Sequence, residues 1–155
     1  MTMTKTIVIV HGVNCGGWCF EPFRAVFEAR GYACHTPDLI GHGADKTDGI
    51  EKLTGVGIVD YRAQMQDFIA ALPEKPILLG HSMGAVVAQQ IAAAGLAEKL
   101  ILASPAPRAG TLPFSEREKQ LGQDLISLGP FWTRAFDPNF VIACNISLNR
   151  LSPAR

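Results

Sequence analysis

The sequence lacks an excess of charge of either sign. Its 155 residues carry 14 lysines and arginines against 14 aspartates and glutamates, and no long basic tract or internal repeat is present. Proteins that bind nucleic acid or an anionic membrane through their overall field need an excess of basic residues. The sequence therefore predicts neither a nucleic-acid partner nor a membrane partner.

Long apolar runs are also absent from the N-terminal region. Residues 1–5 are polar, and the apolar run at 6–10 ends at His11-Gly12. That run is far shorter than a membrane span and is not followed by a signal-peptide cleavage pattern. We therefore expect a cytoplasmic protein. With 48% hydrophobic and 18% charged residues, the chain has the composition of a globular domain.

Metal ligands and cysteine pairs are sparse. The four cysteines are Cys15, Cys19, Cys34 and Cys144. Cys15 and Cys19 have a C-x3-C spacing without a second ligand pair, which does not favour a zinc site. Without a secretory signal, the cysteines are most simply free thiols. The sequence predicts no metal and no cofactor.

The strongest local pattern that is present lies at residues 77–88. An apolar run from Ile77 is followed by Gly80-His81-Ser82-Met83-Gly84 and then by an alanine-rich helical pattern. G-x-S-x-G between a strand and a helix is typical of a nucleophile elbow, where a strained turn exposes the serine hydroxyl. Glycines stand on both sides because side chains there would collide with neighbouring backbone. The alternative is a glycine-rich turn in which Ser82 is a helix N-cap.

The rest of the first hundred residues alternates between strand and helix patterns. Strands are expected at residues 6–10, 32–36, from 76 to the elbow, and 100–103; helices are expected from Glu21 to Arg30, at 59–72 and from Ser82 to about Ala94. This alternation predicts an α/β fold with a parallel sheet. Ligands of such sheets bind at the carboxyl ends of the strands, where His11-Gly12 and Ser82 both lie.

Two loops at those strand ends have distinctive sequences. His11-Gly12-Val13-Asn14-Cys15-Gly16-Gly17-Trp18 contains three glycines in six residues, which allows backbone N–H groups to face a ligand. Pro37-Asp38-Leu39-Ile40-Gly41-His42-Gly43 follows the second strand. A longer loop from Ala44 to Gly57 comes next.

The pattern changes after Pro105, where prolines and glycines interrupt the alternation. Ser115-Glu116-Arg117-Glu118 looks like a capped helix start, and a helix to about Leu128 is expected. We therefore predict two parts, residues 1–105 as the sheet region and residues 106–155 as the beginning of a mostly helical lid.

Taken together, these motifs resemble those of the α/β-hydrolase family. The matching pieces are His11-Gly12, Gly16-Gly17-Trp18-Cys19-Phe20, the 37–43 loop and Gly80–Gly84, in family order over residues 5 to about 107. The resemblance is greatest to the branch of plant methyl esterases and hydroxynitrile lyases, which also holds small bacterial esterases. Those lyases have a hydroxyl residue after the first histidine of this loop. Gly12 stands there instead, which favours ester hydrolysis.

The resemblance implies a role for each matching residue. Ser82 would be the nucleophile, and the backbone N–H groups of Met83 and Val13 would form the oxyanion hole. Gly80, His81 and Gly84 would shape the elbow, and His11, Gly12 and Asn14 would shape the oxyanion loop. The partner would be a small-molecule ester, with no cofactor.

The catalytic acid and base of this family follow the serine in the chain. All four histidines of the sequence, His11, His35, His42 and His81, precede or adjoin Ser82. His11 and His42 are expected to hold loops by hydrogen bonds, His81 to point away from the elbow, and His35 to lie within a strand. Among the acids, Asp38 is expected to brace a loop, and Asp124 and Asp137 to be solvated lid residues. We therefore expect the catalytic acid and base beyond the given chain.

The family sheet has about eight strands, so this sheet is expected to be incomplete, with about four strands. The strand at 100–103 would then present an open apolar edge that favours self-association. Lid side chains such as Phe131, Trp132, Phe136 and Phe140 would lack part of their packing surface. The 155 residues alone are therefore expected to fold and catalyse poorly. Two other functions remain open, a non-catalytic binding module and cofactor-free lyase or perhydrolase chemistry.

Overall fold

The computed structural model describes residues 5–43, 53–107, 110–111, 115–116, 119–120 and 122–123. The chain divides into two compact units, Met1–Gly110 and Thr111–Arg155. Most of the predicted lid, including its four aromatic residues, Asp124, Asp137 and Cys144, lies outside the described residues, as does most of the 44–57 loop. The predicted helix start is described in part, since Glu116, Lys119 and Gln120 are helical.

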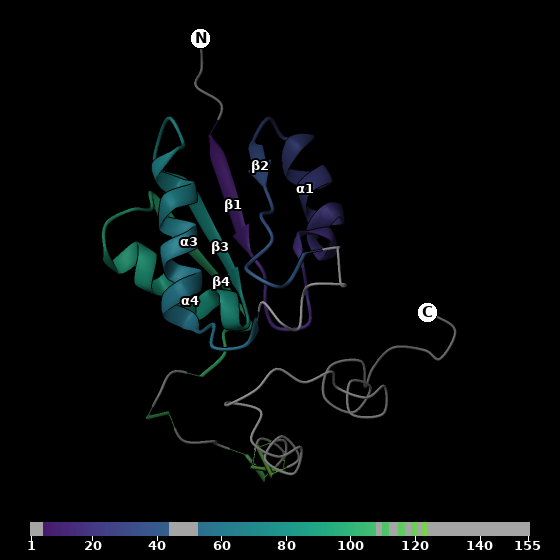
Figure 1. The fold of residues 1–155 in the computed structure, drawn as a ribbon. Helices are drawn as coiled ribbons and strands as arrows, with labels where there is room; N and C mark the ends of the chain where they lie inside the picture. The colour runs from purple at the N-terminus through teal and green to yellow at the C-terminus, as the bar shows by residue number, and fades with distance from the viewer. Residues whose placement is uncertain are drawn as a thin grey trace. The chain divides into compact units, whose positions relative to one another are not determined.

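The first unit alternates strands and helices as predicted (Figure 1). Its elements are β1 (Thr6–Val10), η1 (Gly17–Phe20), α1 (Glu21–Glu28), β2 (Ala33–His35), α3 (Ile58–Ala70), β3 (Ile77–His81), α4 (Met83–Ala93) and β4 (Lys99–Ala103). The short 3-10 turn η1 was not predicted. β2 is also shorter than expected, with three residues instead of the five at 32–36.

The described strands form one parallel sheet in the order β2-β1-β3-β4. β1 and β3 are its central strands, and Val8 pairs with Leu78 while Val10 pairs with Gly80. Because all strands run the same way, the ends of β1 and β3 meet at one edge of the sheet. The loop after β1 and the elbow after β3 are therefore neighbours.

The two faces of the sheet are covered by different helices (Figure 1). Val8, Val10 and Leu78 pack with α3 and α4 in one buried cluster. Ile7, Ile9, Ile77 and Leu79 pack on the opposite side with Phe20 and Phe27. This alternation explains why the central strands are continuous apolar runs, since both of their faces are buried.

The apolar side of α1 is only partly covered by the described residues. Phe27 packs against the core, whereas Phe23 is 52% exposed and Val26 is 50% exposed. None of the described helices is both long and apolar enough to cross a membrane.

The edge strand β4 is apolar and exposed in the described part of the chain. Leu100, Ile101 and Leu102 are 36%, 44% and 41% exposed. β4 pairs with β3 on one side, and no described strand pairs with its other side. An exposed apolar edge offers unpaired backbone groups to another chain.

We predict that the 155 residues, expressed alone, self-associate in proportion to concentration, and that Ile101→Lys reduces this association. A lysine on an edge strand opposes pairing by charge and solvation. Sedimentation velocity over a concentration series measures the effect, with Val59→Lys on exposed helix surface as the control. Equal association of the wild type and Ile101→Lys would contradict the prediction.

Candidate active site

Ser82 lies in a strained turn between β3 and α4. Its backbone has φ 53° and ψ −121°, in the left-handed half of conformational space that non-glycine residues rarely adopt. Its N–H donates to the carbonyl of Ala103 at 3.2 Å, and its carbonyl accepts from the N–H of Ala106 at 3.0 Å. Ser82 stands at the N-cap position of α4, but its side chain makes no cap hydrogen bond to the helix. Its hydroxyl is not engaged by the helix.

The glycines of the elbow are required by close backbone contacts. A Cβ at Gly80 would lie 2.5 Å from the Cα of Ala85, and a Cβ at Gly84 would lie 2.2 Å from the carbonyl oxygen of Val10. Both distances are shorter than real Cβ contacts allow. The helix therefore passes directly over the end of the sheet, and only glycine fits at these two positions.

The loop after β1 reaches the elbow at Gly12. A Cβ at Gly12 would lie 2.8 Å from the Cβ of Ser82 and 3.3 Å from the Nδ1 atom of His81. Val13 and Asn14 form the turn that follows, in which Asn14 has φ 57° and Val13 is 56% exposed. The structure thus brings the predicted oxyanion loop next to Ser82, and Met83 begins α4 on the other side.

His11 is fully buried and holds two loops together. Its Nε2 atom accepts a hydrogen bond from the N–H of Leu39 at 3.0 Å, so Nδ1 carries the proton and donates to the carbonyl of Gly12 at 2.8 Å. Burial lowers the pKa of His11 because the charged ring would lose its hydration. His11 is therefore a neutral structural residue, as predicted.

His42 extends this polar group towards α3. Its Nε2 atom lies 3.2 Å from the hydroxyl of Tyr61, and its ring meets that of His11 edge-on at 5.2 Å between centroids. Burial lowers the pKa of His42, and the neighbouring His11 ring lowers it further. His42 therefore holds its loop against α3 through the hydroxyl of Tyr61.

These two histidines predict a loss of stability in acid. The unfolded chain binds their protons near the ordinary pKa of about 6.5, whereas the folded protein resists protonation. The free energy of unfolding should therefore fall as pH decreases below about 6.5 and level off below the folded pKa values. Urea denaturation between pH 7.5 and 5.0 measures the fall, and His42→Gln should make it smaller. NMR titration midpoints of His11 and His42 at or above 6.5 would contradict the prediction.

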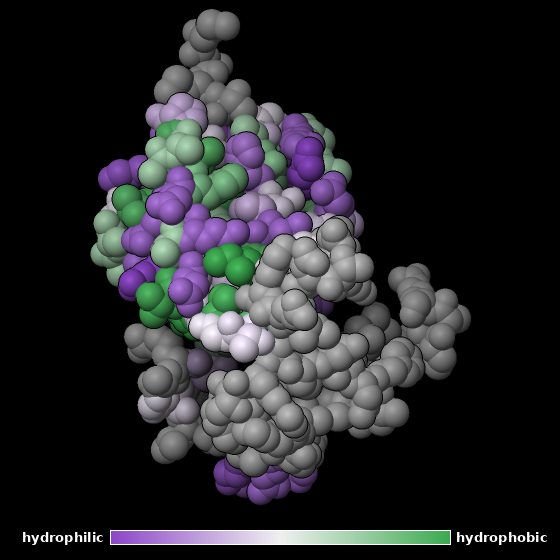
Figure 2. Space-filling model, in the orientation of Figure 1, coloured by the Kyte–Doolittle hydropathy of each residue, from purple (hydrophilic) through white to green (hydrophobic). Residues whose placement is uncertain are grey.

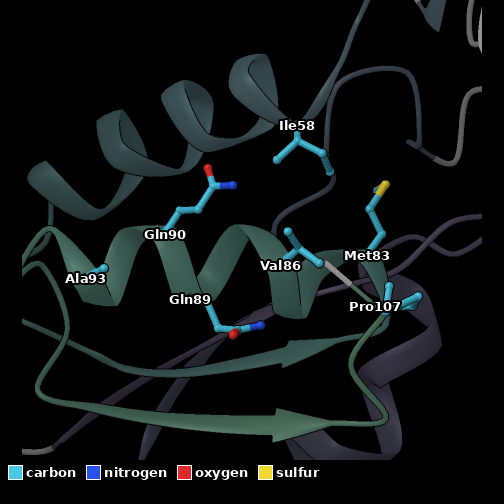
Figure 3. Close-up of a pocket in the computed structure, with 8 residues that line it drawn as sticks. Ile58, Met83, Val86, Gln89, Gln90, Ala93 and Pro107 are labelled. Atoms are coloured by element: carbon cyan, nitrogen blue, oxygen red, sulfur yellow. The ribbon is translucent and has the colours of Figure 1, made fainter. Parts of the chain in front are cut away.

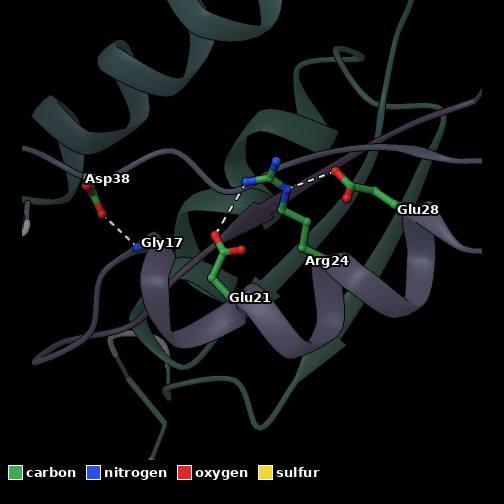
Figure 4. Close-up of polar contacts among 5 residues, drawn as sticks. All are labelled: Gly17, Glu21, Arg24, Glu28 and Asp38. Atoms are coloured by element: carbon green, nitrogen blue, oxygen red, sulfur yellow. Dashed lines mark hydrogen bonds and ion pairs between the residues drawn. The ribbon is translucent and has the colours of Figure 1, made fainter.

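Asp38 braces the glycine-rich loop, as predicted. Its Oδ1 atom accepts a hydrogen bond from the N–H of Gly17 at 2.7 Å (Figure 4). The same close-up shows Arg24 on α1 paired with Glu21 and Glu28, an exposed set that lies away from Ser82 in sequence and contributes little to stability.

Gln64 on α3 is a residue that the sequence did not single out. Its Nε2 atom donates to the carbonyl of Asp38 at 2.9 Å, and its Oε1 atom accepts from the N–H of Ile40 at 3.0 Å. A glutamine in an amphipathic helix is usually a solvated surface residue. No pattern in the sequence distinguishes this one.

No histidine or carboxylate among the described residues is hydrogen-bonded to the hydroxyl of Ser82. The ring of His81 packs edge-on against Phe20 at 5.8 Å, and its buried Nδ1 atom has no partner in the described part of the chain. His35 packs against Phe68. The described residues therefore place no base within hydrogen-bonding distance of the Ser82 hydroxyl.

The cysteines beside the loop do not form a reactive centre. Cys15, Cys19 and Cys34 are free thiols. Burial, together with a hydrogen bond to Cys19, raises the pKa of Cys15 to about 12, which keeps it protonated and weakly nucleophilic. Among the described residues, no group of three potential ligands could hold a metal ion.

An open groove of about 790 Å³ runs along α4 (Figure 3). Met83 and Pro107 lie at the end of α4 that adjoins Ser82, and Ala93 lies towards the other end. The remaining lining residues are Ile58, Val86, Gln89, Gln90 and Ala106. On the face that carries α3 and α4, hydrophobic side chains reach the surface between polar ones (Figure 2). The groove is apolar apart from two amides.

A parallel sheet with helices on both faces, and a G-x-S-x-G turn at its carboxyl edge, defines a hydrolase-type α/β architecture. The comparison with protein families agrees, since the model of the alpha/beta hydrolase family matches residues 7–152. The chain belongs to the alpha/beta hydrolase family.

Individual relatives are similar over about half of the chain. A pyrethroid hydrolase of Sphingobium wenxiniae is 39% identical over 84 residues, which are 54% of this chain and 29% of that protein. Methylesterase 7 of Arabidopsis thaliana is 34% identical over 54% of this chain and 32% of that protein. The crystal structure of a pyrethroid hydrolase from Sphingobium faniae JZ-2 matches with a TM-score of 0.61 and 28% identity, covering 79% of this chain and 51% of that chain. The chain thus spans about a third of the curated relatives that it matches.

Proposed function

We propose that the whole protein is a serine esterase in which Ser82 is the nucleophile. The observation that carries the proposal is the backbone of Ser82, held at φ 53° between a strand and a helix with no cap hydrogen bond from its side chain. Strain at a non-glycine residue persists only where the surrounding structure enforces it, and such residues cluster at active sites. Here the enforcing contacts are the hydrogen bonds to Ala103 and Ala106.

The proposed reaction has two balanced steps. The Oγ atom of Ser82 bonds to the carbonyl carbon of a carboxylic ester, the bond to the alkoxy oxygen breaks, and the serine proton passes through a general base to the leaving alcohol. Water then attacks the acyl carbon and gives a proton to the base. The bond to the Oγ atom of Ser82 breaks, the base returns a proton to this oxygen, and the acid is released. His11 is not this base, because both nitrogens of its imidazole are occupied by hydrogen bonds.

The developing negative charge on the carbonyl oxygen would be stabilised by two backbone donors. Met83 is the first residue of α4, so its N–H is unused by the helix and lies at the positive end of the helix dipole. Val13 follows Gly12, which lies against Ser82. Losing one donor of such a pair typically costs about 10²–10³ in rate.

The substrate class rests on two kinds of support. The similar proteins carry the names pyrethroid hydrolase and methylesterase, both of which denote ester cleavage. The groove along α4 begins beside Met83 with an apolar lining. We therefore propose small esters with an apolar group as substrates, in preference to charged ones.

The test is covalent labelling of the whole protein. A fluorophosphonate probe should modify Ser82, identified by peptide mass spectrometry, and should abolish hydrolysis of p-nitrophenyl acetate in the same proportion. Labelling of Ser104, an exposed serine at the end of β4, is the internal comparison. Ester turnover without modification of Ser82 would refute the proposal.

A further inference from the structure

Resting on the proposed esterase function, we infer that Gln64 is a positioning residue for the oxyanion loop. Gln64 does not touch the elbow. It acts through residues 38–40, and its two hydrogen bonds clamp that segment from α3 on either side of Leu39.

The clamped segment, residues 38–40, contacts both ends of the oxyanion loop, which spans residues 11–17. At the first end, the N–H of Leu39 donates to the imidazole of His11, which in turn donates to the carbonyl of Gly12. At the second end, the carboxylate of Asp38 accepts from the N–H of Gly17. The turn that contains Val13 lies between these two anchors, and the side chain of Val13 is exposed. Its position is therefore set by the anchors.

The anchors themselves depend on where residues 38–40 lie. Leu39 is buried in the core beneath α3, with 1% exposure, which fixes its side chain. The backbone on either side carries an N–H at Ile40 and a carbonyl at Asp38, and both are satisfied by the one amide of Gln64. An apolar side chain at position 64 would remove this partner from both groups, so the segment would no longer be tied to α3 by hydrogen bonds on either side of Leu39.

Such a shift would act on catalysis more than on substrate binding. Oxyanion donors act on charge that develops only in the transition state, so misplacing one lowers kcat with little change in KM. A misplacement of about 1 Å can cost up to about 10²-fold, and we expect a loss of about tenfold in kcat for Gln64→Met. The affinity for a boronic acid, which mimics the tetrahedral intermediate, should fall in the same proportion.

The experiment compares Gln64→Met with Gln66→Met in the whole protein. Gln66 is on the same helix, and its side chain makes no hydrogen bond among the described residues, so it controls for the substitution itself. The expected result is a tenfold lower kcat, an unchanged KM and faster amide exchange over residues 11–17 for Gln64→Met only. Equal kcat and equal exchange in both variants would overturn the inference.

Gln64→Glu provides a second test through pH. The ionised carboxylate can accept from Ile40 but repels the carbonyl of Asp38, whereas the protonated carboxyl restores the donor. The activity relative to wild type should therefore rise as pH falls towards about 4–5. A ratio independent of pH would indicate packing alone and overturn the inference. A protein without Ser82-dependent activity would refute the proposed function. Amide exchange over residues 11–17 does not require ester turnover, so it would still decide whether Gln64 positions the loop.

Discussion

Ser82→Ala in the whole protein is expected to lower kcat for ester hydrolysis by about 10⁴-fold or more, because it removes the hydroxyl on which the proposed acyl-enzyme forms. The residual rate should come from the backbone donors and substrate binding, which do not depend on the serine hydroxyl. Steady-state kinetics with p-nitrophenyl acetate measures the loss. Substrate binding should persist, since the substitution removes only one oxygen.

Ser104→Ala is the matched control for this prediction. Ser104 also has a positive φ, of 44°, and follows β4 at the same edge of the sheet, but it is exposed. The same substitution there should leave kcat within about twofold, as expected for a surface change. A Ser82→Ala protein that retains wild-type turnover would place the chemistry at another residue.

Gly84→Ala is expected to destabilise the protein by more than about 4–5 kcal/mol, a loss that few single substitutions cause. The added methyl group would lie 2.2 Å from the carbonyl oxygen of Val10 and 2.3 Å from that of His11. Neither neighbour is a flexible side chain that could move aside. α4 would therefore have to separate from β1, opening the buried cluster between them.

Urea denaturation of the whole protein measures this effect, with Gly57→Ala as the control. A Cβ at Gly57 would lie 3.9 Å from the nearest side-chain atom, so the cost there should be limited to a weaker N-cap, about 1 kcal/mol or less. If Gly84→Ala gives too little soluble protein for denaturation, the soluble yield relative to Gly57→Ala reports the same difference. Similar unfolding free energies for both variants would contradict the prediction.

Much of the fold was predictable because burial on an element leaves a local pattern. The apolar runs at 6–10 and 77–79 indicated strands, and the structure buries them between α1 and the pair α3 and α4. The glycine-rich elbow was predictable for the same reason, since a close backbone approach excludes every other residue. The loop roles expected for His11 and Asp38 are also confirmed.

Other features had no local signal. The exposure of Phe23 and Val26 contradicts the usual meaning of an apolar helix side, because exposure depends on what else packs there. The turn η1 and the order of the strands likewise depend on contacts between distant segments.

The sequence by itself determined the types of the strands and α-helices, the serine turn and the glycines that make this turn possible, because each depends on residues close together in the chain. Only the tertiary structure decided that Gln64 clamps Asp38 and Ile40, residues that precede it by 26 and 24 positions. A glutamine has the same sequence pattern whether it faces water or another loop. The physical reason is that a hydrogen bond forms only when packing brings donor and acceptor to about 3 Å, and that distance is set by the whole fold.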